Sequence, residues 1–226
     1  MPEPTLYRWP PSAEVGRLVP KTKFYEHGDV PAALREKFVN EVQRISWAYK
    51  LADATIHLAG STAVPEIQVF TIETKGTDVA EEVLAAIDKS IHYPLIFEIT
   101  GAERLRTVAA QKTLGGAKPR VGTYFTTDWA PVDSTRTPLP TAIDLASLYE
   151  AIIARLLPLQ TRVGETMSAA ADRMNEARKV QREIAALKKR LRAEPQLNRK
   201  IDLRRQLKDR EATLRKLTAD TPSNRG

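Results

Sequence analysis

Hydrophobic and polar positions along the last third of the chain repeat with the period of a coiled coil. Between residues 163 and 191 a seam of positions recurs at spacings of four and three, the pattern by which one face of a helix packs on another helix. The seam consists of Val163, Met167, Ala170, Met174, Ala177, Gln181, Ile184, Leu187 and Leu191. The pattern predicts a long helix whose buried seam contains one polar residue, Gln181.

A proline turn interrupts this pattern at Glu194-Pro195-Gln196. Proline ends or bends a helix because it lacks the N–H donor and clashes with the preceding turn. Beyond it, heptad-compatible spacings resume at Leu203, Leu207, Leu214 and Leu217, with Lys200 and Arg210 at the intervening positions and Leu197 and Ile201 as added apolar surface. Two helices joined by so short a turn are expected to fold back as an antiparallel hairpin.

The first 160 residues mix the periods of strands and helices. Residues 66–73 alternate strictly and predict a strand, and further strands are expected at 54–58, 93–99, 104–109 and 122–127. Helices are expected at 31–44, 78–90 and 142–157, the first with Asp29 as its cap, Pro31 in its first turn and Ile45 closing its buried stripe. The predicted fold class is α+β: a mixed small β-sheet domain with flanking helices, followed by the C-terminal antiparallel coiled-coil hairpin.

Charge divides the chain at the same place as the hydrophobic pattern. The net charge of the 226 residues is +7, and residues 162–220 hold 17 Lys/Arg against 9 Asp/Glu, a net of +8. The remaining 18 basic and 19 acidic residues leave the rest near neutral. We therefore expect a globular domain at 1–160, a basic helical hairpin at 161–220 and a disordered tail at 221–226.

Composition excludes several kinds of site. The chain has no cysteine, which rules out disulfides, thiolate metal sites and cysteine nucleophiles, and its three histidines are scattered. Gly115-Gly116-Ala117-Lys118 lacks the spacing of a phosphate-binding loop, and no GxGxxG follows a strand, so binding of ATP or a dinucleotide by these routes is not expected. No apolar run approaches the roughly 20 residues that cross a bilayer, and the N-terminus lacks the features of a signal peptide. We expect a cytoplasmic protein with no membrane partner and no cofactor.

The basic residues around the proline turn are the candidate contacts for nucleic acid or a protein partner. They are Lys188, Lys189, Arg190, Arg192, Arg199, Lys200, Arg204 and Arg205. Two interpretations stay open. The positive excess could contact the phosphates of nucleic acid or an acidic protein, or it could be an ordinary solvated coiled-coil surface, where such charges are common. No aromatic residues are interleaved among these charges to stack on bases.

One arrangement could carry catalysis. Glu73-Thr74-Lys75 ends a predicted strand, with a helix and another strand after it and Asp53 upstream. This order resembles the core of the PD-(D/E)xK nucleases. The resemblance implies that Asp53 and Glu73 would hold Mg²⁺ while Lys75 polarises the phosphate. The alternative is an ordinary polar sheet edge, because period-2 alternation alone places Glu73 and Lys75 on one face.

Several phrases in fixed order resemble the bacterial and archaeal family of domain of unknown function 4391. They are Val19–Tyr25, Ile45–Ala52, Glu66–Ile72, Ile87–Phe97, Thr127–Trp129 and Gln196–Leu203, and they span nearly the whole chain. The resemblance implies a gene neighbourhood: members of the family tend to be encoded beside helicases and DNA methyltransferases in restriction-like or phage-defence loci. It implies no catalytic residues.

Three functional hypotheses follow. The first is a non-catalytic accessory subunit of a bacterial DNA-processing, restriction-like or anti-phage defence complex. This subunit would dock on a helicase or methyltransferase encoded nearby. Whether the basic helical hairpin also contacts DNA directly is left open. The second is the Mg²⁺-dependent nuclease, the only one that requires a cofactor. The third is a structural homo-oligomer built through the coiled coil.

Overall fold

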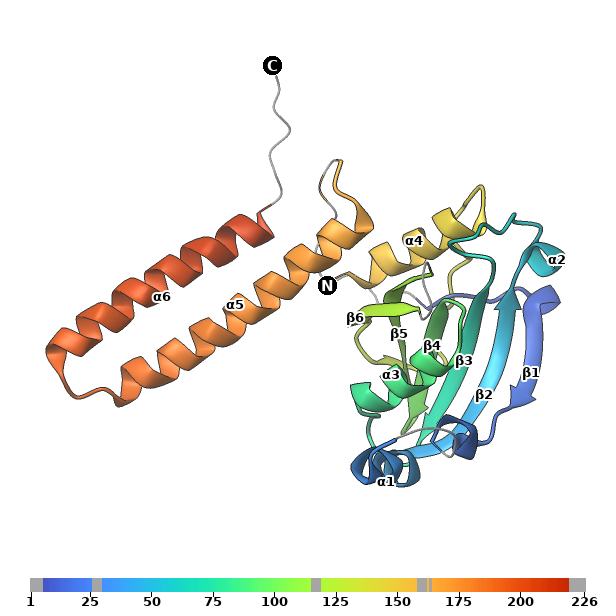
Figure 1. Ribbon diagram of the computed structural model, residues 1–226, viewed down its shortest axis with the longest axis horizontal. Coiled ribbons are helices and arrows are strands. Elements are labelled where there is room, and N and C mark those ends of the chain that lie inside the picture. The colour runs from blue at the N-terminus through green and yellow to red at the C-terminus, as the bar shows by residue number, and fades with distance from the viewer. Residues whose placement is uncertain (1–5, 26–29, 115–118, 158–161, 163, 220–226) are drawn as a thin grey trace, which may run out of the picture. The chain divides into compact units, whose positions relative to one another are not determined.

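The computed structural model describes residues 6–25, 30–114, 119–157, 162 and 164–219 (Figure 1). They fall into two compact units, Met1–Leu157 and Pro158–Gly226, and each unit is considered by itself. The expected disordered tail, the Asp29 cap, the Gly115–Lys118 turn and the Val163 seam position lie outside the described residues.

A mixed, mostly antiparallel sheet forms the centre of the first unit. Its order is β1-β2-β3-β4-β5-β6, with β7 pairing on β5. The strands are β1 (Glu14–Leu18), β2 (Val42–Leu51), β3 (Ile67–Thr74), β4 (Leu95–Gly101), β5 (Arg104–Thr113), β6 (Arg120–Thr126) and β7 (Ala130–Pro131). Only β3 and β4 pair in parallel among the described strands, and helix α3 (Glu81–Ser90) provides the crossover between them. The predicted α+β class is confirmed.

Helices α1 (Ala32–Glu41) and α3 contribute to the main hydrophobic core (Figure 1). Phe38 of α1 and Ile87 of α3 are fully buried against Phe97 of β4 and other apolar residues of the sheet. The helix α4 (Leu145–Leu156) packs on β5 and β6, and Asp144 caps it by accepting the Ser147 N–H at 2.7 Å. The central strands are therefore buried along most of their length; in β3, for example, Ile67, Val69, Phe70 and Ile72 are all buried.

Two predictions about the first helix are wrong. The first helix ends at Glu41, and Ile45 belongs to β2, because the apolar positions that continue the helical stripe are instead paired with β3. Pro31 is the N-cap of α1 rather than a residue of its first turn.

Residues 54–58 do not form a strand. Asp53–Ile56 is a single helical turn, α2, and His57 ends it with a φ of 56°. The Thr55 hydroxyl accepts a hydrogen bond from the Ala52 N–H at 2.9 Å and donates one to the Lys50 carbonyl at 2.8 Å. These local bonds between side chain and backbone take the place of the hydrogen bonds that a strand would form with its neighbours.

A tight hairpin joins β4 to β5. Gly101 pairs with Arg104, and the two residues between them, Ala102 and Glu103, have φ values of 49° and 61°. Positive φ at both central positions is the geometry of a two-residue type I′ turn. A Cβ at Gly101 would lie 2.1 Å from the Thr74 hydroxyl oxygen, so the end of β4 approaches β3 more closely than a larger residue permits.

The second unit is a hairpin of two helices, α5 (Met167–Ala193) and α6 (Leu197–Thr218), which confirms the predicted architecture (Figure 1). Ala170, Met174, Ala177 and Ile184 are buried as predicted, and Leu203 of α6 is 6% exposed. The prediction that Gln181 lies in the seam is wrong. Gln181 is exposed, and the neighbouring Val180 is fully buried in its place. The apolar side chain is the one that gains from leaving water.

Candidate functional site

The eight candidate contact residues gather at one end of the hairpin. Lys188 to Arg192 occupy the end of α5, and Arg199 to Arg205 occupy the start of α6. At 1.5 Å of rise per residue, all eight lie within about 12 Å of the turn along the helix axes. We call residues 188–205 the hairpin tip. The fold thus brings together basic residues from both sides of the proline turn.

The tip holds most of the positive charge of its unit. Its eight basic residues face only two acidic ones, Glu194 and Asp202, a net of +6 out of the +8 of residues 162–220. Seven of the eight cations are exposed, and Lys200 is half-buried. Lys188 forms an ion pair with Glu211 at 3.1 Å, whereas the other seven form none with any residue that the structure describes. The tip is therefore a concentrated positive surface with little internal neutralisation.

Two arginines at the opposite end of the hairpin, Arg162 and Arg173, hold the hairpin together. The Arg162 guanidinium donates to the carbonyls of Lys216 at 2.6 Å and Ala219 at 3.0 Å, and Arg173 donates to the Leu217 carbonyl at 2.9 Å. These carbonyls end α6 and have no partner within the helix. The start of α5 is thereby fastened to the end of α6.

Glu165 holds this fastening in place. Its carboxylate accepts two hydrogen bonds from Arg173, at 2.7 and 2.8 Å, and one from the Arg162 N–H at 2.9 Å. The hydrogen bonds from the Arg173 side chain lower the pKa of Glu165 to about 2. The two ends of the hairpin thus differ: at one end Arg162 and Arg173 bond within the unit, whereas seven of the eight basic side chains of the tip are exposed.

The structure does not bring the three nuclease candidates together. Strands β2 and β3 are antiparallel, and Asp53 follows Leu51, which pairs with Ile67 at the beginning of β3. Glu73 is six residues further along β3, which at about 3.3 Å per residue is about 20 Å away. Asp53 and Glu73 therefore lie toward opposite ends of the strand pair.

Glu73 and Lys75 have structural partners instead. Glu73 forms an ion pair with Arg44 on β2 at 2.9 Å. The Lys75 ammonium donates to the Val39 carbonyl at 2.7 Å, which satisfies an acceptor in the last turn of α1. Among the described residues, no group of three or more His, Cys, Asp or Glu side chains could hold a metal ion.

A buried ion pair in the sheet domain has no counterpart in the sequence-based predictions. Asp88 of α3 and Lys112 of β5 are 2.7 Å apart, with side-chain exposures of 1% and 0%. Lys112 also donates to the carbonyls of Asp88, Ile91 and Tyr93, and the Tyr124 hydroxyl donates to Asp88 at 2.8 Å. Burial raises the pKa of Asp88 and lowers that of Lys112, while the attraction between the two charges opposes both shifts. This cluster ties the end of α3, and the residues that follow it, to strands β5 and β6.

A second buried carboxylate anchors the N-terminal segment. Glu98 of β4 accepts the Trp9 indole N–H at 2.8 Å and two hydrogen bonds from Arg136, at 2.7 and 3.1 Å. Arg136 also donates to the Tyr7 carbonyl at 2.6 Å. The charge of Glu98 is thus engaged by structural partners.

The family of the chain follows from a comparison with family models. The model described as "Domain of unknown function (DUF4391)" matches residues 8–214. The chain belongs to this DUF4391 family. The match includes the sheet domain and the whole hairpin tip, so the resemblance noted in the sequence is confirmed. No curated protein and no solved structure matches the chain.

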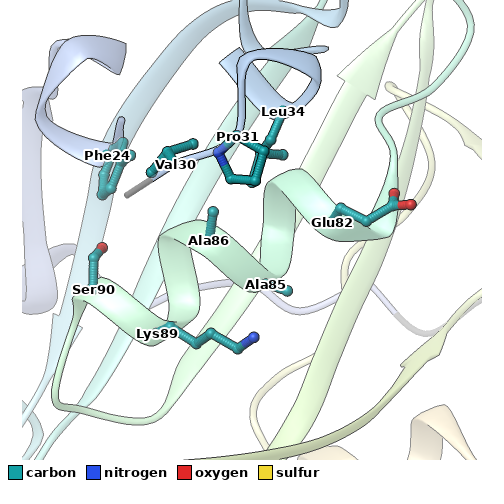
Figure 2. A pocket seen from close by; sticks show the side chains of 9 residues that line it. All are labelled: Phe24, Val30, Pro31, Leu34, Glu82, Ala85, Ala86, Lys89 and Ser90. Atoms are coloured by element: carbon teal, nitrogen blue, oxygen red, sulfur yellow. The ribbon is translucent and has the colours of Figure 1, made fainter. Parts of the chain in front are cut away.

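The DUF4391 chain also has an apolar groove of about 430 Å³ between α3 and the residues leading into α1 (Figure 2). Phe24, Leu34, Ala85 and Ala86 line it, and the charged Glu82 extends away from it at one end. The polar residues of its described lining are Glu82, Lys89 and Ser90, all on α3. Within the described residues, no helix has the length and apolar character needed to cross a membrane.

Proposed function

We propose that this DUF4391 protein is a non-catalytic accessory subunit of a bacterial DNA-processing, restriction-like or anti-phage defence complex. In this proposal a helicase or DNA methyltransferase is the enzyme it accompanies, and the hairpin tip is its contact surface within the assembly. The observation that carries the proposal is the gathering of eight basic residues at the tip, seven of them exposed. The class of partner is taken from the neighbouring genes that the family resemblance implies.

The chemistry of the two units supports a contact role over a catalytic one. The two carboxylates proposed for metal-dependent cleavage, Asp53 and Glu73, are separated by about 20 Å along the β2–β3 pair. The buried carboxylates Asp88 and Glu98 are engaged by Lys112 and by Arg136. The tip, in contrast, offers cations that a phosphate or carboxylate of a partner would neutralise.

Co-purification tests the proposal directly. The full chain, tagged at its N-terminus and expressed with its native neighbouring genes, is purified after nuclease treatment beside a chain lacking residues 162–226. We expect a helicase or methyltransferase to be retained by the full chain and lost on truncation. A full chain that purifies alone would contradict the subunit proposal. An enzyme retained equally by both chains would place the contact on the sheet domain.

Direct contact of the tip with DNA is the part of the proposal that salt dependence tests. Each neutralised phosphate releases condensed counterions, so eight contacts would give a slope of log K against log salt of up to about −7. We expect the slope to flatten when residues 162–226 are removed. A slope that survives the truncation would place DNA binding outside the hairpin.

A further inference from the structure

The outer side of α6 is apolar at the tip and basic beyond it. Leu197 and Ile201, one helical turn apart, are 68% and 55% exposed. The side of α6 that packs on α5 is marked by Leu203, which is 6% exposed. At 100° per residue, Ile201 lies about 160° around the helix from Leu203, so it faces away from α5. Two aliphatic side chains are thus held in water on the first turns of α6.

Basic residues continue the same side of the helix. Residues three, four, seven and eight positions apart share one side, and from Leu197 these positions lead to Ile201, Arg204, Arg205 and Lys208. We call Leu197, Ile201, Arg204, Arg205, Lys208 and Arg215 the outer stripe; all six are exposed. From Leu197 to Arg215 the stripe spans 19 residues, a rise of about 27 Å. The same spacing places one acidic residue, Glu211, on this side between Lys208 and Arg215, and Glu211 is paired with Lys188.

This combination distinguishes a protein partner from a phosphate backbone. A row of cations alone would suit phosphates or carboxylates equally. Two exposed aliphatic side chains at the end of the row gain free energy only where a partner offers an apolar recess to cover them. Phosphate and sugar groups offer no such recess.

We infer that the outer stripe docks on an acidic protein surface, with Leu197 and Ile201 seated in an apolar recess and the cations lying against a row of carboxylates. The inference rests on the proposed function, because it names the chemistry of the partner that the tip contacts. Charge complementarity gives attraction and orientation, and the aliphatic pair gives short-range specificity.

Three probes applied to the full chain test the inference. The first is an acidic helical peptide about as long as the stripe with two leucines at one end. The second is the same peptide with serines in place of the leucines, and the third is a DNA duplex of similar length. Dissociation constants are measured by fluorescence anisotropy at one salt concentration. The tip variant is Leu197→Ser/Ile201→Ser, and the matched control is Val132→Ser/Ile143→Ser, which changes two exposed apolar residues of the sheet domain.

We expect the leucine peptide to bind the wild type at least about tenfold more tightly than the serine peptide. The tip variant should lose this preference while the control keeps it. All four residues are exposed, so unchanged circular dichroism should accompany both variants. Equal binding of the two peptides, no binding of either, or a preference that survives in the tip variant would each overturn the inference.

DNA binding separates this inference from the proposed function. If the duplex binds more tightly than both peptides and the tip variant leaves that affinity unchanged, the outer stripe is a phosphate contact and the inference is wrong. The co-purification experiment can still retain an enzyme in that case, and the proposed function then stands. If the peptide preference is present but no enzyme co-purifies, the proposed complex is wrong and the stripe chemistry is right.

Discussion

Replacing Lys112 with methionine should destabilise the sheet domain severely. The substitution keeps most of the side-chain volume but removes the ammonium that lies 2.7 Å from Asp88. It leaves a carboxylate that is fully buried, and it also removes the donor to the carbonyls of Asp88, Ile91 and Tyr93. The link between the end of α3 and β5 is thereby lost.

The expected loss follows from the burial of the pair. Removing one partner of a buried ion pair costs about 3 to 5 kcal/mol, because the remaining charge has neither water nor a counter-ion. For a domain of this size the urea dependence is roughly 2 kcal/mol per M, so the unfolding midpoint should fall by about 1.5 to 2.5 M. Asp88→Asn in the Lys112→Met background should restore part of the loss, since it removes the uncompensated charge.

Tryptophan fluorescence during urea unfolding provides the assay. Trp9, Trp47 and Trp129 all lie in the first unit, so the signal reports the sheet domain and not the hairpin. The pH dependence separates charge from packing. Burial raises the pKa of Asp88, and losing Lys112 raises it further. The folded variant then binds a proton that the unfolded chain, with a pKa near 3.9, releases. Its stability should therefore increase as the pH falls from 7 toward 4.

A midpoint shift below about 0.5 M would refute this reasoning. So would a large shift that is the same at pH 7 and pH 5, because lost packing does not titrate. A double variant no more stable than Lys112→Met alone would show that the Asp88 charge is not what destabilises the domain.

Further predictions concern the hairpin and the close approach of two strands. Leu203→Ala should cost about 2 to 5 kcal/mol of hairpin stability, measured by thermal loss of helical circular dichroism; an unchanged transition would contradict the packing of α6 on α5. Because Arg173 lowers the pKa of Glu165 to about 2, the fastening is fully present above pH 4.5 and should weaken as the pH falls toward 2. Glu165→Gln should abolish that dependence. Gly101→Ala should destabilise the sheet, because the added Cβ would lie too close to the Thr74 hydroxyl. Adding Thr74→Ala to the Gly101→Ala variant should restore part of the lost stability.

Elements with a strong and unambiguous period were predictable. The strand at Ile67–Thr74 differs by one residue at each end from the predicted 66–73, and α3 occupies most of the predicted 78–90. The hairpin followed from the leucine spacing and Pro195. In each case the local pattern and the tertiary environment favour the same structure.

Prediction failed where a short apolar run suits either period. Val42 and Ile45 fit a helical stripe, but pairing with β3 decides for a strand. Residues 54–58 alternate like a strand, yet Thr55 closes a helical turn through bonds to Lys50 and Ala52. Val180 and Gln181 differ by one position, and a heptad count cannot say which of two neighbours faces the partner helix.

The buried ion pair shows that contacts between residues far apart in the sequence could not be predicted. Asp88 and Lys112 are 24 residues apart, and only the packing of α3 beside β5 brings them together. The available indications were an aspartate on the apolar side of a helix, four residues after Leu84, and a lysine on an otherwise buried strand. Neither position identifies its partner without the sheet order. The tip could be predicted more fully, because the turn that brings its cations together is local.

The central claim is that the hairpin tip is the contact surface of the protein. It is tested most directly by measuring the enzyme retained in the co-purification by two four-residue variants of the full chain. The first changes Arg190, Arg199, Arg204 and Arg205 to glutamine. The second is a matched control that changes Arg17, Lys23, Arg35 and Lys89, four exposed cations of the sheet domain. The account predicts that the tip variant loses most of the enzyme while the control retains it. Equal retention by the two variants would contradict it.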